Sequence, residues 1–153
     1  MLRDTIIRRS TIYHSNNGIA YTLDPSRSDL PVSINRQDIY FNNDHKNIST
    51  TRWLNVIGGI PSNQNGYLIK RNSLITAISI NAKNTVSDAS FFIYDLNTMT
   101  LIHTENISGT STKIVDNLNY QLNTGDRLSV QLQVNSNTVD YPEFNIEYAY
   151  RFN

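Results

Sequence analysis

The sequence predicts an all-β protein: an antiparallel β-sandwich of the jelly-roll type, preceded by an extended N-terminal arm. Asn, Ser and Thr make up about a third of the 153 residues, whereas Ala, Glu and Lys, which favour helices, are scarce. From residue 51 onward, short runs alternate apolar and polar residues and are separated by turn-forming residues. Residues 1–50 show no sustained period. We therefore expect an arm over 1–50 and a sandwich over 51–153.

The N-terminal fifty residues contain isolated apolar residues between turn formers such as Asp24-Pro25 and Leu30-Pro31. A segment of this length without its own periodicity is too long for a loop of a compact domain, so we expect it to be ordered by contacts with other subunits. The alternative is that it wraps around the domain of its own chain. Arginines flanked by apolar residues are suited to an interface. The predicted anchoring residues are Leu2, Arg3, Ile6, Ile7, Arg8, Arg9, Ile12 and Tyr13.

The expected strands follow in chain order, each ended by a turn signal. They are 51–57, 73–80, 90–94, 101–104, 112–115, 127–134 and 144–152, with short extended pieces at 67–69 and 118–122. The strongest pattern is that of 127–134, where Leu128, Val130, Leu132 and Val134 alternate strictly with polar residues. The residues 97–100 between two of these runs predict a hairpin loop.

The last expected strand has an aromatic face. Phe144, Ile146, Tyr148, Tyr150 and Phe152 lie on one side of it if the alternation holds to the end. Aromatic residues are enriched in the cores of interfaces, and we predict that this face forms a homo-oligomer interface. The alternative is that the rings close the core of the sandwich.

The block Leu122-Asn123-Thr124-Gly125-Asp126-Arg127-Leu128-Ser129-Val130-Gln131-Leu132 resembles the turn and penultimate strand of C1q/TNF-like trimeric jelly rolls. The pair 88–94 and 101–105 is similar to the central hairpin of such domains in small virion proteins of tailed bacteriophages, among them head fibres, capsid decoration proteins and tail-tip knobs. The resemblance covers the chain from Trp53 to its end. It implies a trimer in which the arm attaches to the particle.

Motifs for chemistry are lacking, and we predict no enzyme, no catalytic residues, no cofactor and no metal. His14, His45 and His103 are far apart and there is no cysteine to complete a zinc site. Asp44-His45 could form a base with its orienting carboxylate, but no nucleophile-elbow motif accompanies it. The formal net charge is zero, so binding to nucleic acid is not expected. No apolar run approaches the length needed to cross a membrane, and no signal peptide is expected.

Two functions remain open. We predict a structural protein of a virus particle, assembled in the host cytoplasm, whose arm docks on a capsid, portal or tail component while the β-domain projects or cements neighbours. Its partners would be like subunits, with a trimer favoured, and other virion proteins. The alternative is a carbohydrate-binding or receptor-binding module that uses Trp53 or tyrosines to stack on a host glycan. Against it, Trp53 lies beside Leu54 in an expected core strand, where we expect it to be buried.

Overall fold

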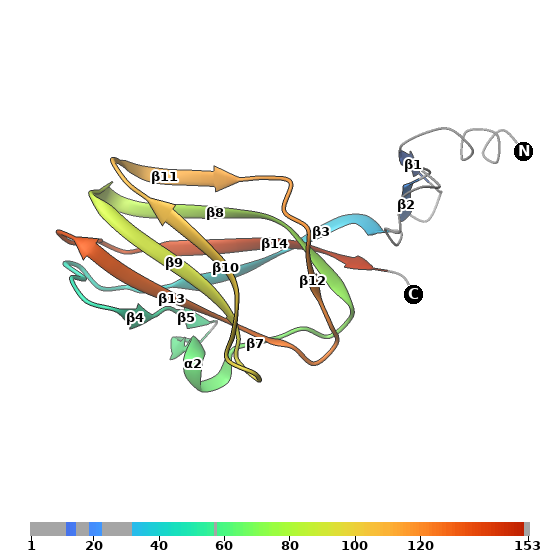
Figure 1. Ribbon diagram of the computed structural model, residues 1–153, viewed down its shortest axis with the longest axis horizontal. Coiled ribbons are helices and arrows are strands. Elements are labelled where there is room, and N and C mark those ends of the chain that lie inside the picture. The colour runs from blue at the N-terminus through green and yellow to red at the C-terminus, as the bar shows by residue number, and fades with distance from the viewer. Residues whose placement is uncertain (1–11, 15–18, 23–31, 57, 152–153) are drawn as a thin grey trace, which may run out of the picture.

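The computed structural model describes residues 12–14, 19–22, 32–56 and 58–151, with side chains from residue 36 onward. Fourteen strands and a short helix lie in this part of the chain (Figure 1). The strands are β1 (Ile12–His14), β2 (Ile19–Thr22), β3 (Val32–Asn42), β4 (Arg52–Trp53), β5 (Asn55–Val56), β6 (Ile60–Pro61), β7 (Tyr67–Leu68), β8 (Ser73–Val86), β9 (Asp88–Asp95), β10 (Thr100–Ile107), β11 (Thr110–Val115), β12 (Tyr120–Leu122), β13 (Arg127–Ser136) and β14 (Glu143–Arg151); the helix is α2 (Ser62–Asn65).

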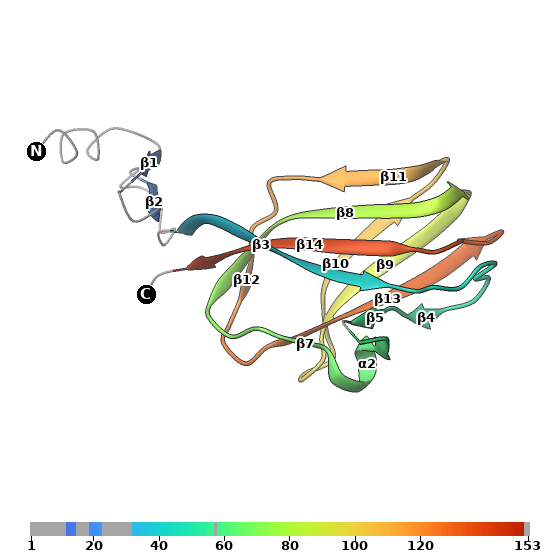
Figure 2. The ribbon, with the colours of Figure 1, turned by 180° about the vertical axis from the view of Figure 1, so that it is seen from behind.

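The strands form two antiparallel sheets. One contains the order β3-β14-β8-β11, with β1 and β2 continuing it beyond β3. The other contains the order β4-β13-β9-β10. Figures 1 and 2 show the two sheets as stacked layers, with β1 and β2 lying beyond the end of β3 and apart from the sandwich.

The pairing of eight of these strands defines a jelly roll. In chain order they are β3, β4, β8, β9, β10, β11, β13 and β14. The first pairs with the eighth, the second with the seventh, the third with the sixth and the fourth with the fifth. A long hairpin folded over on itself produces this nesting, and it yields two four-stranded sheets. The predicted fold class is confirmed.

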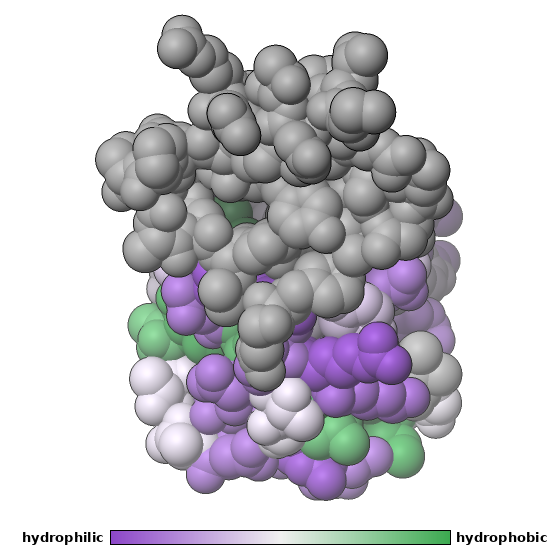
Figure 3. All heavy atoms as spheres, turned by 90° about the vertical axis from the view of Figure 1, so that its right-hand side faces the viewer, coloured by the Kyte–Doolittle hydropathy of each residue, from purple (hydrophilic) through white to green (hydrophobic). Residues whose placement is uncertain are grey.

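The core lies between the sheets and is built by the alternating residues that the sequence indicated. Leu128, Val130 and Leu132 of β13 are completely buried. Phe91 of β9 stacks on Phe144 of β14 across the core, with ring centroids 5.2 Å apart. Such an aromatic pair contributes about 0.5–1.5 kcal/mol beyond the area it buries. Exposed large hydrophobic side chains are scattered over β3, β6, β7, β10, β11 and the turn before β10. Among the coloured residues of the end view in Figure 3, hydrophilic ones predominate.

The boundary predicted at residue 50 is wrong. Strand β3 pairs with β14 over almost its whole length, and Ile39 and Phe41 are 1% and 0% exposed in the core. The loop after β3 is also held, because Ile48 and Val139 exchange two backbone hydrogen bonds. Residues 32–50 therefore pack with the sandwich of their own chain, as the alternative interpretation had it. Of the predicted anchoring residues, Ile12 and Tyr13 lie in β1, and Leu2, Arg3, Ile6, Ile7, Arg8 and Arg9 lie outside the described residues.

The aromatic face of β14 points mainly into the core of the same chain. Phe144 and Ile146 are completely buried and Tyr148 is 5% exposed. A side chain with no exposed surface cannot contact a second subunit, so these three belong to the core, as the second interpretation had it. Tyr150 is partly buried at the edge of the core, and Phe152 lies outside the described residues. For these two an interface remains a prediction.

Candidate functional site

Polar side chains gather at both sides of the sandwich, where the edges of the two sheets meet. At one side β10 lies beside β11, because the two strands are joined by the turn at Ser108 and Gly109. At the other side the chain crosses from β4, which pairs with β13, to β5, which pairs with β3. We call the first group the His103 cluster (His103, Glu105, Lys113 and Tyr120) and the second the Trp53 pocket (Asn43, His45, Arg52, Trp53, Asn55, Gly59, Pro61, Asn63 and Gln64).

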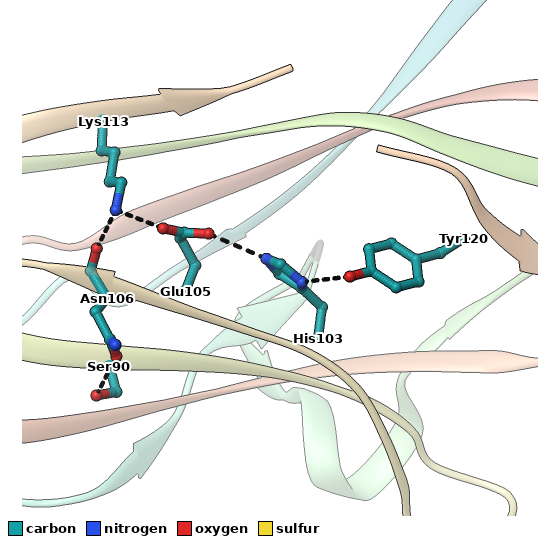
Figure 4. Close-up of polar contacts among 6 residues, drawn as sticks. All are labelled: Ser90, His103, Glu105, Asn106, Lys113 and Tyr120. Carbon is teal, nitrogen blue, oxygen red and sulfur yellow. Dashed lines mark hydrogen bonds and ion pairs between the residues drawn. The ribbon is translucent and has the colours of Figure 1, made fainter. Parts of the chain in front are cut away.

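The His103 cluster is a continuous chain of polar contacts between the sheets (Figure 4). Strand β10 supplies His103 and Glu105, two positions apart and therefore on one face. The His103 Nε2 atom lies 3.1 Å from Glu105 Oε2, and its Nδ1 atom lies 2.9 Å from the Tyr120 hydroxyl. On β11, Lys113 Nζ lies 2.5 Å from Glu105 Oε1 and donates to the carbonyl oxygen of Asn106 at 2.6 Å.

Electrostatics in this cluster favour the ionised carboxylate. Burial opposes the charged form of Glu105, but the hydrogen bonds and charges of Lys113 and His103 outweigh it and hold the pKa of Glu105 below its ordinary value of 4.5. The side chains of His103 and Glu105 are each only 13% exposed. Both ring nitrogens of His103 already have partners. The cluster therefore joins β10 to β11 and β12 and leaves no ring nitrogen free for a metal or a substrate.

The Trp53 pocket is a shallow depression of about 500 Å³ between the end of β3, strand β4 and the segment from β5 to α2. This volume lies within the range of small-molecule sites. Its lining contains one indole, four side-chain amides, an imidazole and a guanidinium. Aspartate and glutamate are not among the lining residues that the structure describes.

The backbone around the pocket is firmly held. The hydroxyl of the fully buried Ser62 donates to the carbonyl oxygen of Val130 at 3.2 Å and accepts from its N–H at 3.1 Å. Leu54 binds the same carbonyl through its N–H at 2.9 Å, and Ser62 N–H donates to Leu54 O at 2.8 Å. Gly66 ends α2 at a φ of +62°, where a Cβ would lie 3.1 Å from Leu128 O. These contacts fix β4 and α2 against β13.

Most of the polar side chains that line the pocket, in contrast, have no partner among the described residues. Within the part of the chain that the structure describes, no side-chain hydrogen bond or ion pair involves His45, Arg52, Asn55, Asn63 or Gln64. Asn43 is only 5% exposed, and its side-chain oxygen accepts the N–H of His45 at 3.1 Å. Its amide nitrogen has no partner among the described residues.

Trp53 differs from its prediction. It is half-buried, whereas its neighbour Leu54 is completely buried. The indole packs against Tyr94 of β9 on the outer face of the sheet, with ring centroids 5.5 Å apart and planes tilted by 55°. Trp53 is therefore an edge residue of the pocket and no core residue. The alternation of side chains along an extended chain could have predicted this difference, since adjacent residues point to opposite faces: Leu54 takes the inner position and Trp53 the outer one.

The other two histidines lie in different parts of the fold. His45 lines the Trp53 pocket, while His14 lies in β1, where no side chain is described.

On the outer face of the other sheet, Glu147 pairs with Arg36 and accepts a hydrogen bond from Thr76 at 2.6 Å. Burial opposes the charge of Glu147, but Thr76 and Arg36 outweigh it and lower its pKa. Burial, followed by the hydrogen bonds to Tyr67 and Tyr150, raises the pKa of Tyr148.

Among the described residues no cluster of three or more His, Asp or Glu side chains could hold a metal ion. No helix in the described ranges is both long and apolar enough to cross a membrane.

Neither a protein-family model nor a curated protein matches the chain in sequence. Solved structures show distant similarity. FlhE is 7% identical, with a TM-score of 0.39 over 76% of this chain and 98% of that one. The coat protein of Tobacco streak virus is 12% identical, with a TM-score of 0.40 over 82% and 91% of the two chains. A chain of the virus-like particle of the extra small virus of the giant freshwater prawn Macrobrachium rosenbergii is 11% identical. Its TM-score is 0.30 over 97% of this chain and 99% of that one. With TM-scores below 0.5, these similarities establish neither a family nor a function.

Proposed function

We propose that this chain is a structural protein of a virus particle that assembles with like subunits through the segment preceding β3. The observation that carries the proposal is the order of the parts: a complete eight-stranded jelly roll follows an N-terminal segment that reaches outside it. Jelly rolls recur as building blocks of viral shells, where they pack side by side. They also occur in lectins, so the fold alone does not decide the function.

The N-terminal segment supports a role in assembly. Strand β2 pairs with β3 only at its end, through Ile19 with Ser33 and Ala20 with Val32. Strand β1 pairs with β2 and forms the edge of the larger sheet. A strand at the edge of a sheet offers unpaired backbone groups to another chain. The hairpin β1–β2 is thus placed where a neighbouring subunit or scaffold could extend the sheet.

The proposal is tested by the mass of the protein in solution. We expect full-length protein to form oligomers or larger assemblies in multi-angle light scattering and electron microscopy, and a chain beginning at Val32 to remain a folded monomer. A cut at residue 51 would be uninformative, because it removes the internal strand β3. A full-length Arg8→Glu/Arg9→Glu variant tests the predicted anchoring arginines without truncation.

Two results would contradict the proposal. One is a full-length protein that stays monomeric at high concentration. The other is an oligomer that survives removal of residues 1–31 unchanged. Circular dichroism and thermal unfolding of each variant provide the control for folding. The bacteriophage setting, the trimer and the identity of the scaffold are finer parts of the same proposal, supported by the resemblance of the turn and strand 122–132 to trimeric jelly rolls.

A further inference from the structure

The Trp53 pocket combines an indole with polar side chains, as a ligand site does, and its backbone is already ordered without a ligand. The backbone hydrogen bonds of Ser62, Leu54 and Gly66 hold the pocket walls, so little ordering is needed when a ligand binds. Apart from the side-chain oxygen of Asn43, however, the polar side chains of the pocket form no hydrogen bond or ion pair within the described part of the chain. A held backbone with side chains that lack partners differs from the turn between β9 and β10, where the side-chain amide of Asn97 donates to the carbonyl oxygen of Gly125 at 2.9 Å.

The lining predicts the chemistry of the ligand. Side-chain amides such as those of Asn55 and Asn63 both donate and accept hydrogen bonds, which matches the hydroxyl groups of a sugar. The half-exposed indole of Trp53 supplies an apolar surface beside them. The unpaired guanidinium of Arg52 adds a planar cation that fits a carboxylate through two parallel hydrogen bonds.

The charge of the pocket also favours a ligand with an anionic group. Arg52 has no carboxylate partner within the described part of the chain, and the described lining contains no acidic residue. Several other cations in the described part of the chain are engaged: Arg36 pairs with Glu147, Lys113 with Glu105, and Arg127 donates to Asn65 O at 2.8 Å. Lys70, like Arg52, has no side-chain partner there, but it lies outside the pocket. A free guanidinium beside amides and an indole is therefore available for an anionic group.

We propose that the Trp53 pocket binds an acidic saccharide, with the sugar's carboxylate on Arg52, its hydroxyl groups on the amides of Asn43, Asn55, Asn63 and Gln64, and one apolar sugar face against Trp53. Asn43 has a specific part in this proposal: its side-chain oxygen is held by the N–H of His45, and its amide nitrogen donates a hydrogen bond to the ligand. This inference is independent of the proposed role in assembly, since it concerns the β3–β4 side of the sandwich and not the segment before β3.

The test uses two pairs of sugars that differ in the carboxylate. Full-length protein is titrated with 3′-sialyllactose against its methyl ester, and with trigalacturonate against galactotriose, while the fluorescence of its one tryptophan and the heat of binding are followed. We expect at least one acidic sugar to bind and to change Trp53 fluorescence, with its neutral counterpart roughly tenfold weaker or more, as expected for loss of a charged contact. The two pairs separate a sialoside from a uronate.

Variants assign the effect to the pocket. Arg52→Gln should remove the preference for the acidic sugar, and Asn63→Ala/Gln64→Ala should weaken both members of the pair. Lys70→Gln is the matched control, because it removes one positive charge from an exposed residue that does not line the pocket. Its affinity should equal that of the unaltered protein.

Three results would overturn the inference. They are the absence of binding to either acidic sugar at millimolar concentration, equal affinity for acidic and neutral sugars, and unchanged binding by Arg52→Gln. Equal thermal unfolding of the variants ensures that a loss of binding is a local effect. Since the measurement does not depend on oligomers, failure of this inference and failure of the assembly role can be told apart.

Discussion

Two sides of the sandwich, one with the His103 cluster and the other with the Trp53 pocket, differ in whether their polar side chains have hydrogen-bond partners. Both lie where the edges of two sheets face each other, and both collect polar side chains. In the His103 cluster every one of the four side chains has a partner in the cluster. Around the Trp53 pocket the backbone is paired, while most polar side chains have no partner in the described part of the chain.

Polar residues at a sheet edge can either pair with one another or face solvent. A half-buried polar group must be satisfied to avoid a cost of about 1–3 kcal/mol, and the His103 cluster is built in this way. Exposed groups in a shallow depression are satisfied by water, which a ligand can replace. The first side therefore contributes stability, and the second is available for binding.

The largest effect is expected from Glu105→Gln. The substitution removes the carboxylate that holds Lys113 and His103, and we expect a loss of about 1–3 kcal/mol in the free energy of unfolding at pH 7. Urea unfolding measures the change. Glu143→Gln is the matched control, since Glu143 lies exposed on β14 without a side-chain partner among the described residues, and it should change stability by less than about 0.5 kcal/mol. A loss equal to the control would show that the cluster does not hold the edge.

Acid should weaken the same side. The folded state holds the pKa of Glu105 below 4.5, so its contribution is present above that value and is lost as the pH falls through the lowered pKa. We expect the unaltered protein to lose more stability between pH 7 and pH 3 than Glu105→Gln does. Thermal unfolding across this range, followed by circular dichroism, measures the difference. Parallel curves for the two proteins would contradict the assignment.

A smaller effect is expected from Tyr120→Phe. It removes the hydroxyl that lies 2.9 Å from His103 Nδ1 and keeps the ring, which packs against His103 with centroids 5.2 Å apart. The expected loss is about 1 kcal/mol. Tyr40→Phe is the control, because Tyr40 is 58% exposed and its hydroxyl has no partner in the described residues. Equal stability of both variants would show that the hydroxyl contributes nothing.

The smallest effect is expected in the pocket. Asn63→Ala and Gln64→Ala remove side chains without partners, and each should change the free energy of unfolding by less than about 0.5 kcal/mol. A loss above 1 kcal/mol in either variant would mean that these amides support the fold. The distinction between the two sides of the sandwich would then fail.

Sequence patterns predicted β9, β10 and β13 well, whereas β3 was not predicted. Alternation in 127–134 and the hairpin of 90–94 with 101–104 appear in the structure as β13, β9 and β10. The pattern of β3 is weak because, among its residues with described side chains, Ile39 and Phe41 are the buried ones, and the apolar but exposed Tyr40 between them hides the period of two. The aromatic face of β14 was predicted to form an interface between subunits. In the structure the opposite sheet covers most of this face, which local sequence cannot indicate.

The two polar groups could not be predicted from local patterns. The Trp53 pocket combines residues of 43–45, 52–55 and 59–64, which meet only because β4 pairs with β13 and β5 pairs with β3. The His103 cluster likewise depends on which strands become edges. Within it, the spacing of His103 and Glu105 was the one local signal, because it places both on one face of a strand. This spacing does not predict that Lys113 and Tyr120 join them.

Acrylamide quenching of Trp53 tests the contrast most directly, because the chain has a single tryptophan and it lies at the pocket. Folded full-length protein should be quenched measurably, with a constant below that of the urea-unfolded chain and an emission maximum between those of buried and fully exposed indole. The value should stay the same in Glu105→Gln, which alters the opposite side. Emission typical of a buried indole, with quenching only after unfolding, would contradict an open pocket on the β3–β4 side.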